Sequence, residues 1–240
     1  MKTLTQHSLA FLGVLLAASG SSIASAQDLI ANGGFETGFS GWTRVDQLGS
    51  DGTFQLQTGT ASPVNGFTVP GPREGLRSAM SDSVGPGSHA LYQDFVVPAL
   101  VPGATLKFSI FINNGATAFS VPNSLDFSTP ALNQQARVDI LRGGTDPFSL
   151  APADVLLNAF QTALNSPLVT GYNDFTIDVG ALLAANAGQT LRLRFAEVDN
   201  VNFFNFGVDA VSLTIIPAPS AFALAGIVVL GASRRRRASI

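Results

Sequence analysis

Cysteine is absent from this chain of 240 residues, and histidine, tyrosine and tryptophan are scarce, at two, two and one. Without cysteine there can be no disulfide, no thiol nucleophile and no cysteine-ligated metal. With two histidines, a zinc site built from several imidazole or thiolate ligands is not expected. Stability must then come from an apolar core, and a chain of this length can bury one without such cross-links.

His7 lies in the N-terminal segment, which leaves His89 as the one histidine of the body. It follows Gly85-Pro86-Gly87-Ser88, where a strand is expected to begin. A serine triad needs an acid beside its histidine, and no Gly-x-Ser-x-Gly elbow accompanies any serine. We interpret His89 as a lone surface histidine and expect no enzymatic activity. A glycan-active enzyme with paired carboxylates is the weakest alternative.

Basic residues are few outside the C-terminus. All 16 acidic residues lie between Asp28 and Asp209, against eight of the 13 basic residues, a balance of −8. Nucleic-acid binding needs a basic face that neutralises phosphates, so no nucleic acid is expected as a partner. Most of these acids are expected to be solvated surface groups, and some could hold a hard cation.

The N-terminus, residues 1–26, has the layout of a signal peptide. A short polar start precedes an apolar run at residues 9–18, and Ala24-Ser25-Ala26 fits the small-residue rule of signal peptidase, with a mature start at Gln27. The run is too short to cross ~30 Å of hydrocarbon, which argues against an uncleaved anchor. Export across the inner membrane is therefore expected.

The C-terminus combines three parts within residues 217–237. Pro217-Ala218-Pro219 precedes an apolar run at 222–232, and four arginines follow, namely Arg234, Arg235, Arg236 and Arg237. A helix can start only after Pro219. This leaves about 14 residues, or ~20 Å at 1.5 Å per residue, for a thin transmembrane helix. The arginines should stay cytoplasmic and the acidic body outside; burying them in a terminal strand or helix would be costly.

This order of parts resembles the PEP-CTERM sorting signal of Gram-negative bacteria, with Pro217-Ala218-Pro219 in place of Pro-Glu-Pro. The resemblance covers residues 217–237 only. It implies recognition by an exosortase, a membrane cysteine transpeptidase that cuts near the motif and removes the helix. The expected partners in processing are signal peptidase, exosortase and, transiently, the inner membrane. The expected location is the cell surface or the exterior, reached through a membrane-anchored precursor.

The body, residues 27–216, has the alternation of an all-β domain. Apolar side chains at every second position predict strands, at 53–57, 90–97, 106–113, 136–141, 175–179, 191–195 and 206–215. Residues 154–162 fit a strand or a helix, and 181–187 fit one helical turn. Residues 49–87, apart from the strand at 53–57, and 115–134 are expected to form long loops. The pattern predicts a two-sheet sandwich, most simply a jelly roll.

Two short stretches resemble the first and last strands of galactose-binding-like jelly rolls, which include many carbohydrate-binding modules. They are Asn32-Gly33-Gly34-Phe35-Glu36 with Gly41-Trp42, and Gly207-Val208-Asp209-Ala210-Val211-Ser212-Leu213. The resemblance implies neighbouring strands, and a structural Ca2+ ion held by Glu36 and Asp209 with backbone carbonyls, Asn32 being a weaker ligand candidate.

Asp209 can also be interpreted from its strand period. Period two places Asp209 on the face of Val211 and Leu213, toward the core, where a carboxylate needs a cation or hydrogen-bond donors. The alternative to calcium is that Asp209 accepts backbone N–H bonds while Glu36 caps a turn.

Sugar rings usually stack on exposed aromatic side chains. The chain has 18 phenylalanines, two tyrosines and one tryptophan, a bias that favours core filling. Trp42 is interpreted as a core residue, and the candidate glycan platforms are Tyr92, Phe119, Tyr172 and Phe204. We predict a structural or adhesive protein of the surface or extracellular matrix that contacts exopolysaccharide. The alternative is a carbohydrate-binding module with a defined glycan site.

Overall fold

The computed structural model describes residues 26–63, 65–82 and 84–216. These contain a short helix and eleven strands, whose bounds are β1 Gln27–Asp28, β2 Thr43–Asp46, β3 Thr53–Gln57, β4 Ser78–Asp82, β5 Gly87–Val96, β6 Ala104–Asn114, β7 Gln134–Arg142, β8 Val155–Gln161, β9 Asn173–Asp178, α1 Gly180–Ala185, β10 Thr190–Asp199 and β11 Phe204–Ile215. All strand pairs are antiparallel.

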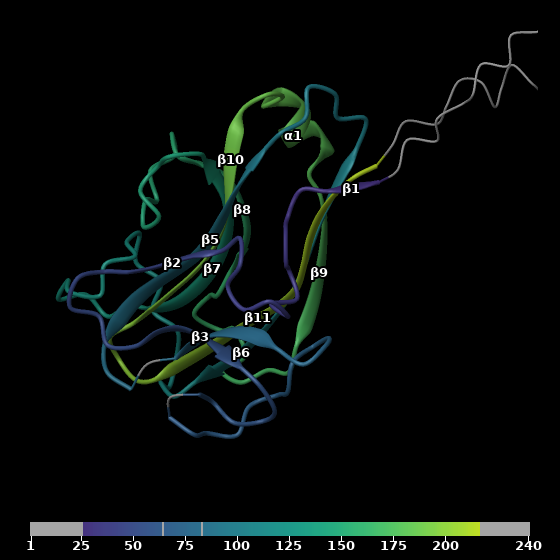
Figure 1. The fold of residues 1–240 in the computed structure, drawn as a ribbon. Coiled ribbons are helices and arrows are strands. Elements are labelled where there is room, and N and C mark those ends of the chain that lie inside the picture. Colours follow the sequence, from purple (N-terminus) through teal and green to yellow (C-terminus); the bar gives the residue numbers. More distant parts are fainter. Residues whose placement is uncertain (1–25, 64, 83, 217–240) are drawn as a thin grey trace, which may run out of the picture. The chain divides into compact units, whose positions relative to one another are not determined.

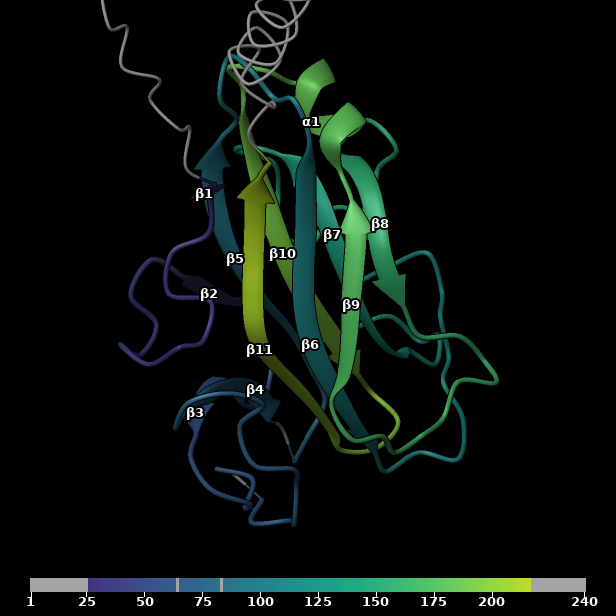
Figure 2. The ribbon, with the colours of Figure 1, turned by 90° about the vertical axis from the view of Figure 1, so that its right-hand side faces the viewer.

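The strands form two sheets that face each other across one core (Figures 1 and 2). One sheet has the order β3-β4-β11-β6-β9, with β1 also paired to β11, and the other has the order β2-β5-β10-β7-β8. From β4 onward the chain passes from sheet to sheet at almost every step, which is the winding of a jelly roll. The predicted all-β, two-sheet sandwich is confirmed. Both sheets lie in one compact unit, Ser25–Ala218, so the segment 27–216 carries its own core.

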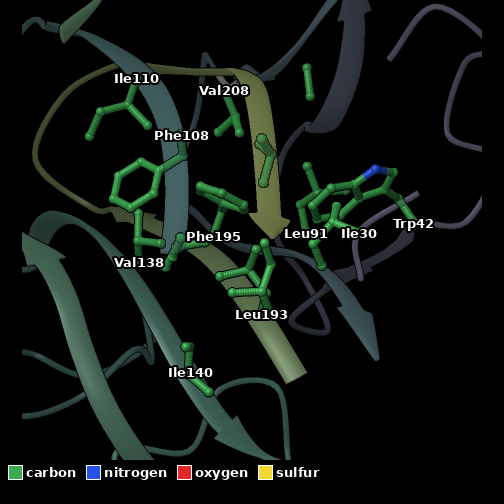
Figure 3. Close-up of a cluster of buried hydrophobic side chains, with 14 of the residues drawn as sticks. Ile30, Trp42, Leu91, Phe108, Ile110, Val138, Ile140, Leu193, Phe195 and Val208 are labelled. Carbon is green, nitrogen blue, oxygen red and sulfur yellow. The ribbon is translucent and has the colours of Figure 1, made fainter. Parts of the chain in front are cut away.

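The core lies where alternate side chains of the two sheets meet (Figure 3). Phe108 of β6 and Phe195 of β10 come from opposite sheets and pack edge to face, with ring centroids 5.8 Å apart. Trp42 packs on Phe35 and Phe195 at 5.2 and 6.0 Å and is 7% exposed, which confirms it as a core residue. Each such buried side chain contributes about 1.5–3 kcal/mol relative to an exposed one.

Strand β4 falls where the sequence predicts a long loop, and β1 and β2 fall where it predicts no regular element. β4 reads Ser-Ala-Met-Ser-Asp, and Ala79 and Met80 pack on opposite faces of its sheet. Small polar residues have little strand preference of their own, so its neighbours β3 and β11 decide its conformation. The ambiguous segment 154–162 contains strand β8, and α1 occupies the predicted helical turn.

A bulge in β11 changes the side to which Asp209 points. The pairing of β11 with β6 shifts register between Asp209 and Ser212, and Ala210 has a φ of 51°. The extra residue reverses the alternation, so Val208 and Leu213 both reach the core while Asp209 faces the outer side of the sheet. The expectation that Asp209 shares the core-facing side of Leu213 is therefore wrong.

Within the described part of the chain, no helix is long and apolar enough to span a membrane. The predicted signal peptide (residues 1–25 of it) and the predicted sorting signal, 217–237, lie outside the described residues.

Candidate functional site

A groove of about 660 Å³ lies on the outer face of β11, β6 and β9, the side turned to the viewer in Figure 2. Its floor carries Lys107 and Ser109 of β6 and Asp174 and Thr176 of β9. These residues alternate along their strands with core residues, so the strand period places them outward. The turn at residues 32–34 and the loop at 73–74 form the rim.

An ion pair joins the rim to the floor. Arg73 Nη2 lies 2.8 Å from Asp174 Oδ2, and Arg73 Nε donates to Oδ1 at 3.1 Å. Ser109 Oγ also donates to Asp174 Oδ1, at 2.5 Å. The hydrogen bond from Arg73, followed by that from Ser109, lowers the pKa of Asp174 to about 2. The side chains of Arg73 and Asp174 are 48% and 57% exposed, so charged hydrogen-bonding groups are accessible in the groove.

Two of the predicted calcium ligands hold the rim loop in place. Asp209 Oδ2 accepts the N–H groups of residues 73 and 74 at 2.7 and 3.1 Å. Glu36 Oε1 accepts those of residues 76 and 77 at 2.8 and 2.9 Å. Between them Gly75 has a φ of 61°, and a Cβ there would lie 2.3 Å from Glu36 Oε1. The two carboxylates thus fasten both ends of one loop, and glycine is required between them.

Asn32, the third predicted ligand, shapes the other rim. Its amide donates to the carbonyls of Gly38 and Ser40 at 2.8 and 3.1 Å, and its Oδ1 accepts the Thr37 N–H at 3.2 Å. Burial raises the pKa of Asp209 to about 6. The backbone hydrogen bonds named as the alternative to calcium are present, and calcium binding by these residues stays a prediction.

The four aromatic candidates do not gather in one place. Phe119 and Phe204 are 0% exposed and pack on each other with ring centroids 5.7 Å apart, so neither ring offers a face to a sugar. The Arg192 guanidinium covers Tyr92 at 3.7 Å from its ring centroid. Tyr172 is half-buried against Phe111, and burial raises its pKa above the usual value.

A second cavity, of about 370 Å³, lies between two loops that cover the outer face of the other sheet. It combines apolar side chains, Phe148 and Leu150, with the polar groups of Asp126 and Asp146. Gln47 Nε2 donates to Asp126 Oδ1 at 2.5 Å, and this bond is the main reason for the lowered pKa of Asp126. The cavity therefore places an aromatic ring beside two carboxylates, which can accept hydrogen bonds from hydroxyl groups.

No protein-family model and no curated protein sequence matches the chain. Among solved structures, TmCBM61, determined in complex with beta-1,4-galactotriose, is similar with a TM-score of 0.47 and 13% identity over 78% of this chain and 97% of that chain. The K3 adhesin domain of Lys-gingipain from Porphyromonas gingivalis has a TM-score of 0.47 and 18% identity over 78% and 99%. The Stig cyclase Fisc from Fischerella sp. TAU has a TM-score of 0.46 and 21% identity over 81% and 100%.

Sequence reasoning did not identify the groove residues Arg73, Lys107 and Asp174. They are single charged residues in unremarkable surroundings, and only the sheet order brings them together. The interpretation of His89 as a surface residue is wrong: its side chain is 0% exposed, because β5 starts before it and continues its inner face through Leu91.

Proposed function

We propose that this protein is an exported, non-catalytic component of the cell surface or extracellular matrix, with its groove in contact with extracellular polysaccharide. The observation that carries the proposal is the groove itself, about 660 Å³, in which an accessible carboxylate, guanidinium and ammonium lie beside hydroxyl groups. Sugar hydroxyls both donate and accept hydrogen bonds, and charged groups make the stronger ones. The volume lies in the range of ligand sites.

The groove favours polar contacts over ring stacking. The aromatic residues among its lining residues, Phe108 and Phe175, stack on each other at 4.9 Å, and Phe108 is 1% exposed. Polar contacts alone give modest affinity per site, because each hydrogen bond to a sugar replaces one to water. Modest affinity fits an adhesive protein present in many copies along a polymer, where avidity supplies the strength.

The proposed location at the cell surface is inferred from the N-terminal and C-terminal segments of the chain. We propose that signal peptidase releases Gln27 and that an exosortase cuts near Pro217-Ala218-Pro219, removing the membrane helix and the arginines. Mass spectrometry of the surface protein is expected to find the mature C-terminus near Pro217. An exported product that retains Arg234–Arg237 would contradict this processing.

The alternative, a carbohydrate-binding module with a defined glycan site, is favoured by the second cavity, where Phe148 offers a ring next to Asp126 and Asp146. A glycan array probed with the segment 27–216 tests both functions. Binding to acidic or neutral polysaccharides is expected, and absence of binding to every glycan would exclude the groove and the cavity together.

Calcium is proposed as a structural ion at Glu36, Asp209 and Asn32. Support comes from two carboxylates that fasten one rim loop, the exposed Glu36 and the buried Asp209. A cation would offset the cost of burying Asp209. Treatment with EDTA followed by calcium is expected to lower and then restore the melting temperature. A melting temperature that is the same with EDTA and with added calcium would refute the ion.

A further inference from the structure

Three side chains of metal-ligand type meet on the inner face of the sheet β2-β5-β10-β7-β8. The register of β5 and β10 places Glu197 opposite His89 and Asp199 opposite Gly87. Phe195 of β10 faces the core, so the strand period directs Glu197 and Asp199 to the same inner face. One ligand atom from each of His89, Glu197 and Asp199 lies within 4.8 Å of the others.

This cluster is buried in the interior of the protein. His89, Glu197 and Asp199 are 0%, 0% and 1% exposed. Arg192 and Arg194 of β10 and Arg137 of the neighbouring β7 point to the outer face of the sheet, where they bond to carboxylates of that face. Glu197 and Asp199 thus lie two residues apart on one buried face of β10. Carboxylates held in such a place need a cation or a retained proton.

His89 is oriented so that one ring nitrogen faces this cluster. Its Nδ1 lies 2.7 Å from Asp46 Oδ1 of the neighbouring strand β2. A carboxylate at Nδ1 holds the proton there and leaves the lone pair on Nε2, the arrangement found behind metal-bound histidines. Nε2 is buried and has no hydrogen-bond partner. A polar atom in this state points to a missing ligand.

Gly87 keeps the space at Nε2 open. A Cβ on Gly87 would lie 2.4 Å from His89 Nε2, and the Gly87 N–H donates to Asp199 Oδ1 at 3.0 Å. Nε2 and the Asp199 carboxylate therefore lie beside the same glycine. Any side chain at position 87 would fill the space between them.

We propose that His89 Nε2, Glu197 and Asp199 bind one divalent transition-metal ion of the zinc class. One imidazole nitrogen with two carboxylates suits zinc, whereas calcium and magnesium prefer oxygen ligands only. Bonds of about 2.0–2.2 Å in a tetrahedral site place ligand atoms roughly 3.4 Å apart. From separations within 4.8 Å, small side-chain rotations reach that geometry. The two carboxylates balance the charge of the ion.

A small cavity beside Asp199 has room for a water molecule as the fourth ligand. It has a volume of about 90 Å³, is lined by Asp199 and by residues 84–86 and 200–202, and exceeds the space that one water needs. Because the three protein ligands are buried, the ion serves structure: it ties β10 to β5 and, through Asp46, to β2. This site is on the sheet opposite to the polysaccharide groove and does not depend on that proposal.

Metal content and stability of the segment 27–216 test the site. After dialysis against a chelator, added Zn2+ is expected to bind at one ion per chain and to raise the melting temperature by about 5–10 °C at a hundredfold excess over Kd. Mg2+ at the same concentration is expected to have no effect. A dialysed protein that binds no zinc and melts at an unchanged temperature would overturn the proposal.

Two further measurements separate this site from surface binding of zinc. Co2+ is expected to give the visible absorption bands of a tetrahedral nitrogen–oxygen site, a readout that needs no variant. Glu197→Gln is expected to lose the zinc-dependent rise in melting temperature, whereas Asp174→Asn, in the exposed groove, keeps it. Equal zinc responses in Glu197→Gln and the wild type, or a Co2+ spectrum identical to that of the aqueous ion, would refute the assignment.

Discussion

At the scale of single residues, the buried carboxylate of Asp139 is bonded to two arginines. Arg137 donates to it at 2.6 and 2.8 Å, Asn158 donates at 2.8 Å, and Arg194 is bonded to it from β10. Asp139 and Arg194 are both 0% exposed, so each depends on the other for charge compensation. We expect such a cluster to fix the register of β7 against β10 more than it adds to the stability of the folded state.

Asp139→Asn is expected to lower the free energy of unfolding by about 3–5 kcal/mol, because it leaves buried arginines without their counter-charge. Urea unfolding at neutral pH measures the change. Asp174→Asn removes an exposed ion pair and serves as the matched control, with a much smaller expected loss because solvent screens that pair. Equal losses in the two variants would contradict the importance of burial.

The same carboxylate predicts acid sensitivity. Burial raises the pKa of Asp139, but the hydrogen bonds and charges of Arg137 and Arg194 outweigh it and hold the pKa below its usual value. The folded state therefore binds this proton less readily than the unfolded state does. The stabilisation is complete above the unfolded pKa of about 4 and is lost as the pH falls through the folded value. Unfolding measured from pH 5 downward should show this loss in the wild type and much less of it in Asp139→Asn.

At the scale of elements, the bulge in β11 and the turn at residues 32–36 depend on each other. The Val211 N–H donates to the Gly33 carbonyl at 3.1 Å, and a Cβ on Gly33 would lie 1.7 Å from the Val211 carbonyl oxygen. The two backbones therefore touch at a position that only glycine can occupy. This contact places Asn32 and Asp209 at the groove.

Gly33→Ala is expected to cost at least about 3 kcal/mol of unfolding free energy, because backbone must move to admit the methyl group. Gly171→Ala is the control, since a Cβ there meets no atom within 4 Å and its φ is unexceptional. Thermal melting of both variants checks the difference. A Gly33→Ala protein as stable as Gly171→Ala would show that the turn does not pack on the bulge.

The strands that could be predicted from the sequence are those in which apolar and polar residues alternate. β6, β7 and β10 alternate apolar and polar residues and appear where expected. The side of Asp209 was not predictable, because a single inserted residue at Ala210 reverses the alternation. The site of His89 was not predictable either, since Glu197 and Asp199 lie more than a hundred positions away and only the β5–β10 register brings them beside it.

At the scale of the whole molecule, the two sheets present different surfaces. The outer face of β11-β6-β9 carries the polar groove, and the outer face of the other sheet is covered by loops around the Phe148 cavity. The interior is apolar over most of its length and polar where His89 meets Glu197. A glycan that binds in the groove and one that binds in the cavity would therefore depend on different, widely separated side chains.

The central claim is that polysaccharide binds in the groove, and affinity of single variants for a glycan found on the array tests it most directly. Lys107→Ala is expected to weaken binding about tenfold, as loss of one charged hydrogen bond predicts. Arg142→Ala, an exposed cation on the other sheet, and Phe148→Ala, in the second cavity, are expected to bind as the wild type does. Unchanged binding by Lys107→Ala together with lost binding by Phe148→Ala would contradict the groove and assign the glycan to the second cavity.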